Sequence, residues 1–417
     1  MKIFKFGGAS VKDAAAVKNI AVVLKKTGVQ DLVVVVSAMG KSTNALERVV
    51  SAYFKNRDLV NGAIGEVSMF HTSILKNLFE SAQHPVYASI KTLFASLSAF
   101  LRINKSTDRD YVYDQVVSYG ELLSTTIVSA YLNEIAIANT LLDVRTCIVT
   151  NADYRDAKVD WGKTQKKIVQ RVTKKGITVT QGFLGAETAN NVTTTLGREG
   201  SDYTAAIFAH CLNAGSVTIW KDVAGVLNAD PRYFDNPTLL KHISYTEAMQ
   251  LTFYGASVIH PKTLQPLQHK EIPLYVKSFF NPSQPGTRVG KGLALDPEVP
   301  CFVLKKEQVL ISVSSPGFSF ITEKQMGEVF RLLHTFKMKV AVVQSSAVRF
   351  SVCAANGFGQ LGPLLAALRT TFKVSCHEGV TLCTVRRPGP GDCEGLSAGK
   401  TVLLKQQNQG AVHLVIK

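Results

Sequence analysis

Short apolar runs separated by glycine turns and helical stretches mark the first part of the chain. Residues 2–6 form a β-rich run that ends at Gly7 and Gly8, and Asp13 can then cap a helix. Residues 31–36 are continuously apolar and β-branched, as in a strand that is buried on both faces. This order of strand, glycine turn, helix and strand predicts a βαβ unit with a parallel sheet.

The middle of the chain alternates between helical and strand patterns. Residues 51–103 carry aromatics and leucines at three- and four-residue spacing, which predicts a helical insertion. Three further strands are predicted, at residues 177–180, 216–220 and 274–276. Residues 281–287 and 290–300 contain Gly and Pro without periodicity, so we expect a domain boundary there, between a domain at 1–290 and a region at 300–417.

The C-terminal region has a different order of predicted helices and strands from the rest of the chain. Its pattern predicts a strand, a helix, two strands and a second helix, at residues 309–314, 322–336, 340–344, 349–354 and 361–372. This β-α-β-β-α order predicts a ferredoxin-like α+β module. The expected fold class is therefore a mainly parallel α/β sheet sandwiched by helices, followed by an α+β region.

Composition narrows the class of protein. The 417 residues are 46% apolar and 19% charged, as in ordinary globular domains. No apolar run approaches the ~18 residues that span a bilayer, so we expect no membrane partner. The seven cysteines are scattered and form no C-x-x-C pair, which argues against a disulfide framework or a zinc site and favours a reducing cytoplasm.

The net charge of +16 admits two interpretations. A basic excess can indicate a nucleic-acid partner. Here the basic residues are dispersed without interleaved aromatics, although residues 301–417 hold 14 basic against 6 acidic residues, half of the excess. We expect a cationic surface that attracts anionic substrates, and no nucleic-acid partner.

The segment Lys5-Phe6-Gly7-Gly8-Ala9-Ser10 has the chemistry of a phosphate site. A lysine ends a strand, two glycines allow close approach of the backbone, and a helix start favours an anion. The structural alternative is a tight turn with a surface lysine.

A second polar segment, residues 195–204, runs into a predicted helix at 203–213. Ser201 and Asp202 are good N-caps, which is the structural alternative for them. Arg198 has no such role, and its guanidinium suits bidentate capture of a carboxylate.

Two more segments complete the pattern. Residues 220–232 hold two acids and two bases in a turn-rich loop after a strand, typical of either a nucleotide loop or a solvated loop. In residues 253–263, Pro261 fits the first turn of a helix, and His260 is expected to cap or pack rather than catalyse.

Together these segments resemble the K-F-G-G-T-S-V, G-R-G-G-S-D-Y-T-A, W-T-D-V-x-G-V-x-x-A-D-P-R and F-G-A-K-V-x-H-P signatures of aspartate kinases, in the amino-acid kinase superfamily. The segments 37–40, 43–44 and 120–124 also match in order, so the resemblance covers nearly the whole chain. It implies ATP-dependent phosphorylation of the aspartate side-chain carboxylate to 4-phospho-L-aspartate, the first step toward lysine, threonine and methionine.

The resemblance also implies roles for the matching positions. Lys5 and Asp202 are the implied catalytic pair, and the residues implied to hold aspartate are Thr43, Glu121, Arg198 and Ser201. The implied nucleotide-binding residues are Lys5, Gly7, Gly8, Lys221, Asp222, Asp230, Arg232 and Ser257. Mg²⁺ is expected to arrive with ATP, without a metal site of the protein's own. A carboxylate nucleophile with a pKa near ~4 is already ionised, so no general base is needed.

The chain departs from these signatures at several positions. The family lysine of F-G-A-K is Ser257 here, the threonine of W-T-D is Lys221, and a glycine is replaced by Glu199. We expect Lys221 or Lys262 to replace the missing cation. A non-catalytic amino-acid sensor and a kinase for glutamate or N-acetylglutamate are the alternatives; retention of Lys5, Arg198 and Asp202 favours catalysis.

The C-terminal region resembles the ACT modules that bind feedback amino acids. The first module looks complete, and the second, residues 384–417, looks shortened and ends on an apparent strand, 412–416. We therefore expect a homodimer or higher homo-oligomer, with lysine or threonine as effector on the first module.

Overall fold

The computed structural model describes residues 1–28, 30–173, 175–190, 192–256, 259–317, 319–408 and 410–417. The chain forms two compact units. The first comprises Met1–Val226, Leu239–Thr246 and Val258–Asp296, and the second comprises Leu227–Thr238, Glu247–Ser257 and Pro297–Lys417. The domain limits expected from the sequence, 1–290 and 300–417, remain predictions.

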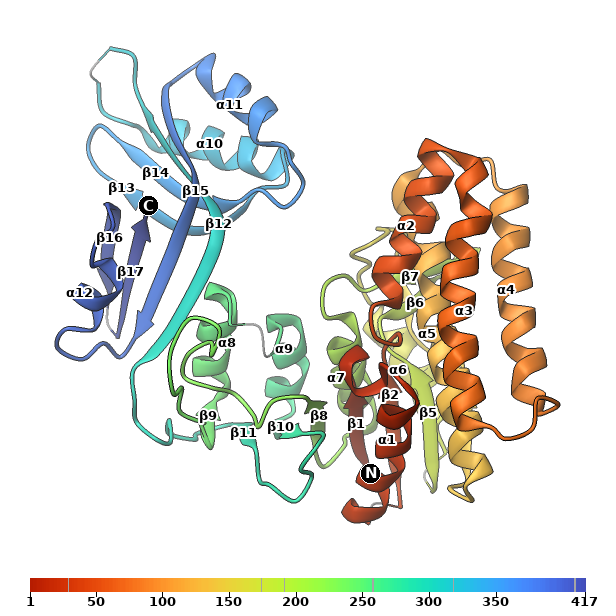
Figure 1. Ribbon diagram of the computed structural model, residues 1–417. Helices are drawn as coiled ribbons and strands as arrows, with labels where there is room; N and C mark the ends of the chain where they lie inside the picture. Colours follow the sequence, from red (N-terminus) through yellow and green to blue (C-terminus); the bar gives the residue numbers. More distant parts are fainter. Residues whose placement is uncertain (29, 174, 191, 257–258, 318, 409) are drawn as a thin grey trace. The chain divides into compact units, whose positions relative to one another are not determined.

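An eight-stranded sheet forms the centre of the first unit (Figure 1). Its strands, in spatial order, are β3 (Asn139–Leu142), β5 (Ile177–Gln181), β2 (Leu32–Val36), β1 (Lys2–Phe6), β8 (Val217–Lys221), β10 (Leu274–Ser278), β11 (Thr287–Gly290) and β9 (His242–Ser244). Neighbouring strands are parallel except for β10 and β11, which are antiparallel. The mainly parallel sheet that the sequence predicted is confirmed.

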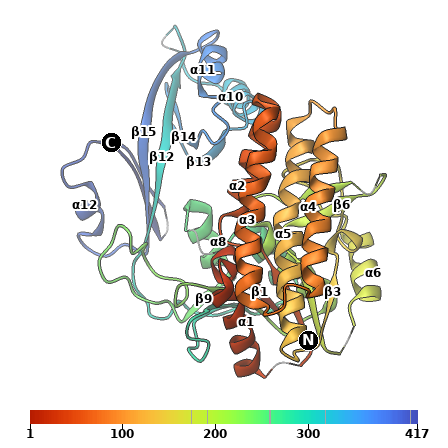
Figure 2. The ribbon, with the colours of Figure 1, turned by 45° about the vertical axis from the view of Figure 1, so that its right-hand side comes forward.

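Helices cover both faces of this sheet. The side chains of Phe4, Phe6 and Val34 point to the face that carries the large apolar core. The helices that build this core are α1 (Ala14–Thr27), α2 (Ser42–Lys55), α3 (Val60–Leu78), α4 (Pro85–Ile103) and α5 (Arg109–Glu134), and the last four run side by side in both views (Figure 2). Because side chains alternate along a strand, Ile3 and Lys5 point to the opposite face.

The opposite face of the sheet meets α7 (Gly200–Leu212), which contacts β1, β2 and β8. On this side α7 packs between α6 (Trp161–Arg171) and α9 (Pro261–His269). A smaller sheet of β4 (Val149–Thr150), β6 (Leu184–Glu187) and β7 (Thr193–Thr195) also belongs to this unit, whereas α8 (Tyr245–Tyr254) lies mostly in the second unit, from Glu247 onward. Three 3-10 turns complete the unit: η1 (Gly8–Val11), η2 (Arg57–Leu59) and η3 (Val144–Thr146).

Helix α4 is long and apolar enough to cross a membrane by length and composition alone. In the fold it is an amphipathic helix, since Val86, Ile90, Leu97 and Leu101 are buried in the apolar core at helical spacing. Its remaining surface is largely exposed, and Ile103 at its end is 69% exposed.

The second unit contains a six-stranded antiparallel sheet. Its strands, in spatial order, are β13 (Lys339–Ser345), β14 (Phe350–Ala355), β12 (Cys301–Ser314), β15 (Lys373–Arg386), β17 (Ala411–Ile416) and β16 (Val402–Asn408). The long strands β12 and β15 run through the whole sheet. Helices α10 (Glu323–Thr335) and α11 (Leu361–Arg369) close an apolar core at one end, and α12 (Asp392–Ser397) lies at the other.

One half of this sheet confirms the ferredoxin-like prediction. The end of β12, α10, β13, β14, α11 and the start of β15 follow the β-α-β-β-α-β order of that module. The sequence placed the first strand only at residues 309–314, whereas β12 begins at Cys301. The run Lys305-Lys306-Glu307 hides the strand pattern, because the chain bulges there and Glu307 adopts a φ of 55°.

Candidate active site

The Lys5 ammonium and the Asp202 carboxylate face each other inside the first unit. Lys5 lies next to the end of β1, and Asp202 lies in the first turn of α7. Lys5 Nζ is 2.7 Å from Asp202 Oδ1, and the two side chains are only 10% and 2% exposed. The ion pair therefore fixes a cation where a strand ends opposite a helix start, a position suited to a negatively charged ligand.

The glycine turn after β1 brings backbone close to this cation. A Cβ at Gly8 would lie 3.0 Å from the carbonyl oxygens of both Ala38 and Gly40. A Cβ at Gly7 would lie 3.1 Å from Lys5 Nζ. A larger residue at Gly7 would displace the lysine, and one at Gly8 would displace the turn at Ala38 and Gly40, so the two glycines allow this close packing.

A cavity of about 510 Å³ opens beside the ion pair. It brings together eight of the predicted site residues: Lys5, Gly8, Thr43, Glu121, Arg198, Ser201, Asp202 and Lys221. Thr43 comes from the first turn of α2, Glu121 from the middle of α5, and Lys221 from the end of β8. The parallel sheet explains this convergence, because the carboxyl ends of its strands meet at one edge.

The start of α7 corrects one expectation. The predicted helix began at residue 203, with Ser201 and Asp202 as possible caps, but α7 begins at Gly200 and its N-cap is Glu199. Both residues are buried within the first helical turn, and Asp202 pairs with Lys5 instead of capping. Helix capping therefore does not explain either residue.

Glu121 is a buried carboxylate in the wall of the cavity. Its Oε1 accepts a hydrogen bond from the Ala38 N–H at 3.1 Å, and its Oε2 has no hydrogen-bond partner among the described residues. Burial raises the pKa of Glu121 to about 8, against the smaller opposing effects of the Ala38 N–H and the Lys5 charge. This carboxyl group can accept a hydrogen bond or a cation from a ligand.

Sequence reasoning missed Arg155, which also lines the cavity. Its backbone is left-handed, with a φ of 67°, and its N–H donates to both oxygens of the fully buried Asp114, at 3.2 and 3.1 Å. Asp114 also accepts from the Thr195 N–H at 2.8 Å and the Thr195 hydroxyl at 2.7 Å. Asp114 thus ties the 155 turn to strand β7.

The Arg155 side chain is held from two sides. Its guanidinium lies 4.4 Å from the centre of the Tyr113 ring and pairs with Asp110 at 3.2 Å. Burial raises the pKa of Asp114 to about 6, although its hydrogen bonds with Thr195 and Arg155 oppose this shift. In the sequence, Asp114 is marked only by the apolar and aromatic residues around it, such as Val112 and Tyr113.

Glu199 occupies a position where the resembling signature has glycine. Its φ of 54° is left-handed, and its Oε2 is buried without a hydrogen-bond partner among the described residues. Burial and the Asp202 charge raise the pKa of Glu199, whereas the charges of Lys221, Arg198 and Lys5 lower it. The conformation explains why glycine suits this position.

Three further predicted residues, Asp222, Asp230 and Arg232, are not among the residues that line the cavity. Asp222 is exposed after β8. Asp230 and Arg232 belong to the second unit and form an ion pair with each other at 2.5 Å, which lowers the pKa of Asp230. Ser257 lies outside the described residues. Their predicted nucleotide contacts remain predictions.

Two residues near the fourth segment have clear partners. His260 accepts the Lys262 N–H at its Nδ1, at 3.2 Å, and is the N-cap of α9, as the sequence predicted. The Lys262 ammonium pairs with Asp156 and is not among the residues that line the cavity. Lys221 does line it.

Comparison with known proteins agrees with this architecture. The model of the amino acid kinase family matches residues 1–278. The chain is 29% identical over 397 residues to the chloroplastic bifunctional aspartokinase/homoserine dehydrogenase of Daucus carota, covering 90% of this chain and 42% of that protein. The chain thus spans less than half the length of that curated relative.

Two solved structures of E. coli aspartokinase III match the entire chain. The complex with aspartate and ADP has a TM-score of 0.86 at 26% identity, and the match covers 100% of this chain and 96% of that one. The complex with lysine and aspartate has a TM-score of 0.79 at 26% identity and covers 100% and 95%. With a family match over two thirds of its residues and a fold shared from end to end, the chain belongs to the amino acid kinase family.

Proposed function

We propose that this protein transfers the γ-phosphoryl group of ATP to the side-chain carboxylate of L-aspartate, forming 4-phospho-L-aspartate. This reaction is the first step toward lysine, threonine and methionine. The observation that carries the proposal is the buried Lys5–Asp202 pair, which borders a cavity with Thr43, Glu121 and Arg198. The resemblance to E. coli aspartokinase III, whose structure holds aspartate and ADP, supports it.

In this proposal Lys5 and the glycine turn bind the phosphate groups of ATP. Phosphoryl transfer requires positioning and cations where negative charge collects. Lys5 supplies that charge, and Asp202 holds the ammonium in one place. The backbone of Gly7 and Gly8 approaches the phosphates in this proposal, and a Cβ at either position would lie within 3.1 Å of the Lys5 ammonium or of the carbonyl oxygens of Ala38 and Gly40.

In this proposal other side chains that line the cavity bind aspartate. Glu121 accepts the ammonium of aspartate, since its Oε2 lacks a partner among the described residues. Arg198 is exposed at the cavity and binds a carboxylate. Arg155 adds a second guanidinium, which allows the site to favour a substrate with two carboxylates. Thr43 and Ser201 complete the contacts.

Mg²⁺ neutralises phosphate charge when it is bound with ATP. It keeps much of its water in such sites and needs only one or two protein carboxylates. In this proposal the metal arrives with the nucleotide; the described residues contain no group of three or more His, Cys, Asp or Glu side chains that could hold a metal ion. No general base is required, since the attacking carboxylate is already ionised at neutral pH.

The remaining nucleotide contacts are assigned by the resemblance. Lys221, Asp222, Asp230, Arg232 and Ser257 contact the nucleotide in this proposal. Lys221, which borders the cavity, replaces the cation of the family lysine at position 257. Lys262 is the weaker candidate for that role, because it is not among the residues that line the cavity.

Regulation and assembly extend the proposal. The first ferredoxin-like module binds a feedback amino acid, lysine or threonine, in a homodimer or higher homo-oligomer. The lysine complex of E. coli aspartokinase III supports a feedback ligand of this class. A cytoplasmic location is also part of the proposal, in keeping with seven cysteines that are all free in the structure.

An ADP-release assay with separate amino acids tests the reaction. The purified chain is given Mg-ATP with aspartate, glutamate, N-acetylglutamate or no acceptor. We expect ADP release with aspartate to exceed every other condition by at least about tenfold. Turnover that prefers glutamate or N-acetylglutamate would assign a sibling kinase instead, and no turnover together with binding of an amino acid would assign a sensor.

A further inference from the structure

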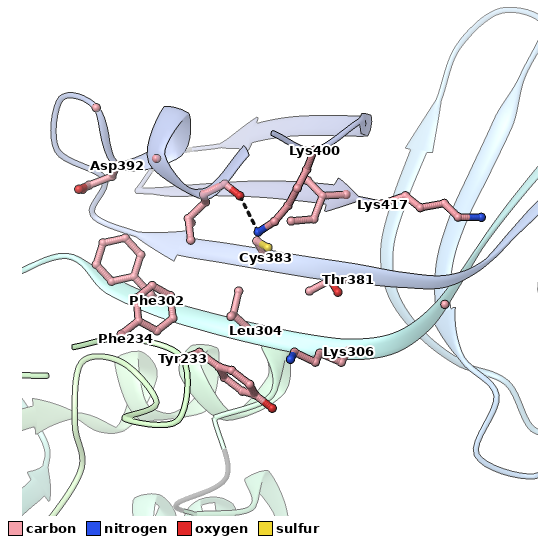
Figure 3. Close-up of a pocket in the computed structure, with 15 residues that line it drawn as sticks. Tyr233, Phe234, Phe302, Leu304, Lys306, Thr381, Cys383, Asp392, Lys400 and Lys417 are labelled. Carbon is pink, nitrogen blue, oxygen red and sulfur yellow. Dashed lines mark hydrogen bonds between the residues drawn. The ribbon is translucent and has the colours of Figure 1, made fainter. Parts of the chain in front are cut away.

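A second cavity, of about 780 Å³, lies entirely within the second unit (Figure 3). Strands β12, β15 and β17 form its floor, α12 and the residues after it form one side, and the segment of Tyr233 and Phe234 forms the other. None of its residues is used in the proposed reaction. Its volume is in the range of about 300–1,000 Å³ that is typical of small-molecule sites.

The floor of this cavity is apolar. Leu304 on β12 is paired with Cys383 on β15, and Thr381 is paired with Ile416 on β17, so these side chains share one face of the sheet. Cys383 and Ile416 are buried, and Leu396 of α12 packs against the same small cluster. The apolar body of a ligand placed here would be removed from water.

Aromatic side chains build the second wall. The rings of Phe234 and Phe302 are stacked, with centroids 5.2 Å apart and planes inclined by 28°. Tyr233 is 42% exposed, and the Lys306 ammonium lies 4.0 Å from its ring centre. A partly exposed aromatic wall next to a cation favours a ligand with a flat or branched apolar body and a negative charge.

The charges around the cavity are mostly positive. Lys306, Lys400 and Lys417 line it, and Asp392 is the single acidic residue among its lining side chains. Asp392 already accepts the Gly389 N–H through its carboxylate. Lys400 Nζ donates to the Leu396 carbonyl oxygen at 3.3 Å, the contact drawn in Figure 3.

Two lysines, Lys306 and Lys400, flank the apolar floor. Among the described residues no carboxylate forms an ion pair with either ammonium group, and these groups contact the Tyr233 ring and the Leu396 carbonyl oxygen. The Asp230 carboxylate, whose pKa the Lys306 charge helps to lower, forms its ion pair with Arg232. Both groups can turn toward an anion without breaking an ion pair.

We propose that this cavity binds a small organic anion, a carboxylate or phosphate attached to an aromatic or branched apolar body. The anionic group contacts Lys306 and Lys400, and the body lies over Leu304 and Cys383 against Phe302. The bound anion also touches the segment that begins directly after Arg232. This proposal does not depend on the reaction assigned to the first unit.

The test uses the fluorescent anion 8-anilinonaphthalene-1-sulfonate and its uncharged analogue N-phenyl-1-naphthylamine, each titrated into the full chain. The charge-removing variant is Lys306→Met with Lys400→Met. It should weaken binding of the sulfonate about tenfold, because two partly exposed charge contacts are worth several-fold each, and leave the uncharged probe within twofold. Lys306→Arg with Lys400→Arg should retain binding, and Lys339→Met, an exposed lysine on β13, is the matched control.

Several outcomes would overturn the proposal. One is equal affinity of the sulfonate for wild type and the double methionine variant, with circular dichroism confirming that the variant is folded. Another is displacement of the sulfonate by saturating ATP and aspartate, which would place it in the first unit. A third is absence of probe binding by the wild-type oligomer together with binding by a dissociated monomer, which would mean that a second copy of the chain covers this face.

Discussion

Lys5 Nζ lies 2.7 Å from Asp202 Oδ1, so the end of β1 and the first turn of α7 are joined by a buried ion pair. In the proposed reaction this lysine neutralises charge on the transferring phosphoryl group. Lys5→Ala should lower kcat by at least about 10³-fold, as expected when a main source of electrostatic stabilisation is lost. Steady-state kinetics with Mg-ATP and aspartate measure the effect.

The control for this prediction is on the same strand. Lys2→Ala removes an exposed lysine of β1 and should leave kcat within about twofold of wild type. Lys5→Ala also leaves Asp202 buried without its cation, which costs about 3 kcal/mol or more, so thermal unfolding must show that the variant is still folded. A folded Lys5→Ala enzyme with ordinary turnover would contradict the role of Lys5.

Glu121 predicts a proton release on substrate binding. Its pKa is raised to about 8, so the free protein holds this group mostly protonated at pH 7. The ammonium of aspartate favours the ionised form, and binding at pH 7 should therefore expel close to one proton. Calorimetric titrations in buffers of different ionisation enthalpy measure that number, and heats that do not depend on the buffer would refute it.

The raised pKa of Glu121 also predicts how the stability of the protein changes with pH. Because the folded pKa of Glu121 lies above its ordinary value, the unfolded chain loses this proton first, and stability falls as pH rises from about 4.5 to about 8. Glu121→Gln should abolish the proton release and flatten this part of the stability profile. Its affinity for aspartate should fall, since the charge that meets the ammonium is absent.

The hydrogen bonds of Asp114 predict that its substitution lowers stability and also weakens aspartate binding in the cavity. Asp114→Asn places an amide where three donors from Arg155 and Thr195 converge, and each buried donor left without an acceptor costs ~1–3 kcal/mol. We expect lower stability in denaturant unfolding and a raised KM for aspartate, because the left-handed turn that carries Arg155 loses its anchor. Asp110→Asn, which touches only the exposed end of Arg155, is the control.

The pH dependence of Asp114 provides a further check on that variant. Its folded pKa of about 6 lies above the ordinary 3.8, so the wild type gains stability relative to Asp114→Asn as pH falls from about 6 to about 4. The full gain is about 3 kcal/mol, from a shift of roughly two pKa units. A constant difference between the two proteins over this range would contradict the burial of an ionised Asp114.

Glu199 and Lys221 predict a coupled pair of substitutions. Burial raises the pKa of Glu199 and the Lys221 charge opposes this shift, and Glu199 and Lys221 line the cavity at positions where the resembling signatures have glycine and threonine. Lys221→Thr should reduce kcat/KM strongly, whereas Glu199→Gly should relieve a left-handed backbone that costs ~1–2 kcal/mol. The combined variant should be less impaired than the sum of the two single effects. If the effects of the two substitutions on kcat/KM are additive, the charges of Glu199 and Lys221 act independently.

Local patterns predicted the parts of the site that lie close together in the sequence. The β1 strand, the glycine turn and Lys5 form one short segment, in which a strand end, free backbone and a cation are all visible in the residue order. That Glu121 and Asp202 line the same cavity was expected only from the resemblance. The spacing of apolar residues does not predict it, because it depends on how α5 and α7 pack.

Other features depend on long-range contacts that no local pattern encodes. Asp114 meets Thr195 only after β7 folds against α5, and Arg155 reaches the cavity only through that contact. The early start of β12 was hidden because its charged bulge interrupts the apolar alternation. The cavity of the second unit was equally invisible, since its walls come from segments around Tyr233, Leu304 and Leu396.

The central claim is that a carboxylate of aspartate attacks ATP at Lys5. The most direct measurement adds hydroxylamine to the chain with Mg-ATP and L-aspartate and identifies the trapped hydroxamate by mass spectrometry. The account predicts aspartate hydroxamate on the side-chain carboxyl group, in step with ADP release by wild type and Lys2→Ala, and almost none with Lys5→Ala. ADP release without any aspartate hydroxamate, or equal hydroxamate with a folded Lys5→Ala protein, would contradict it.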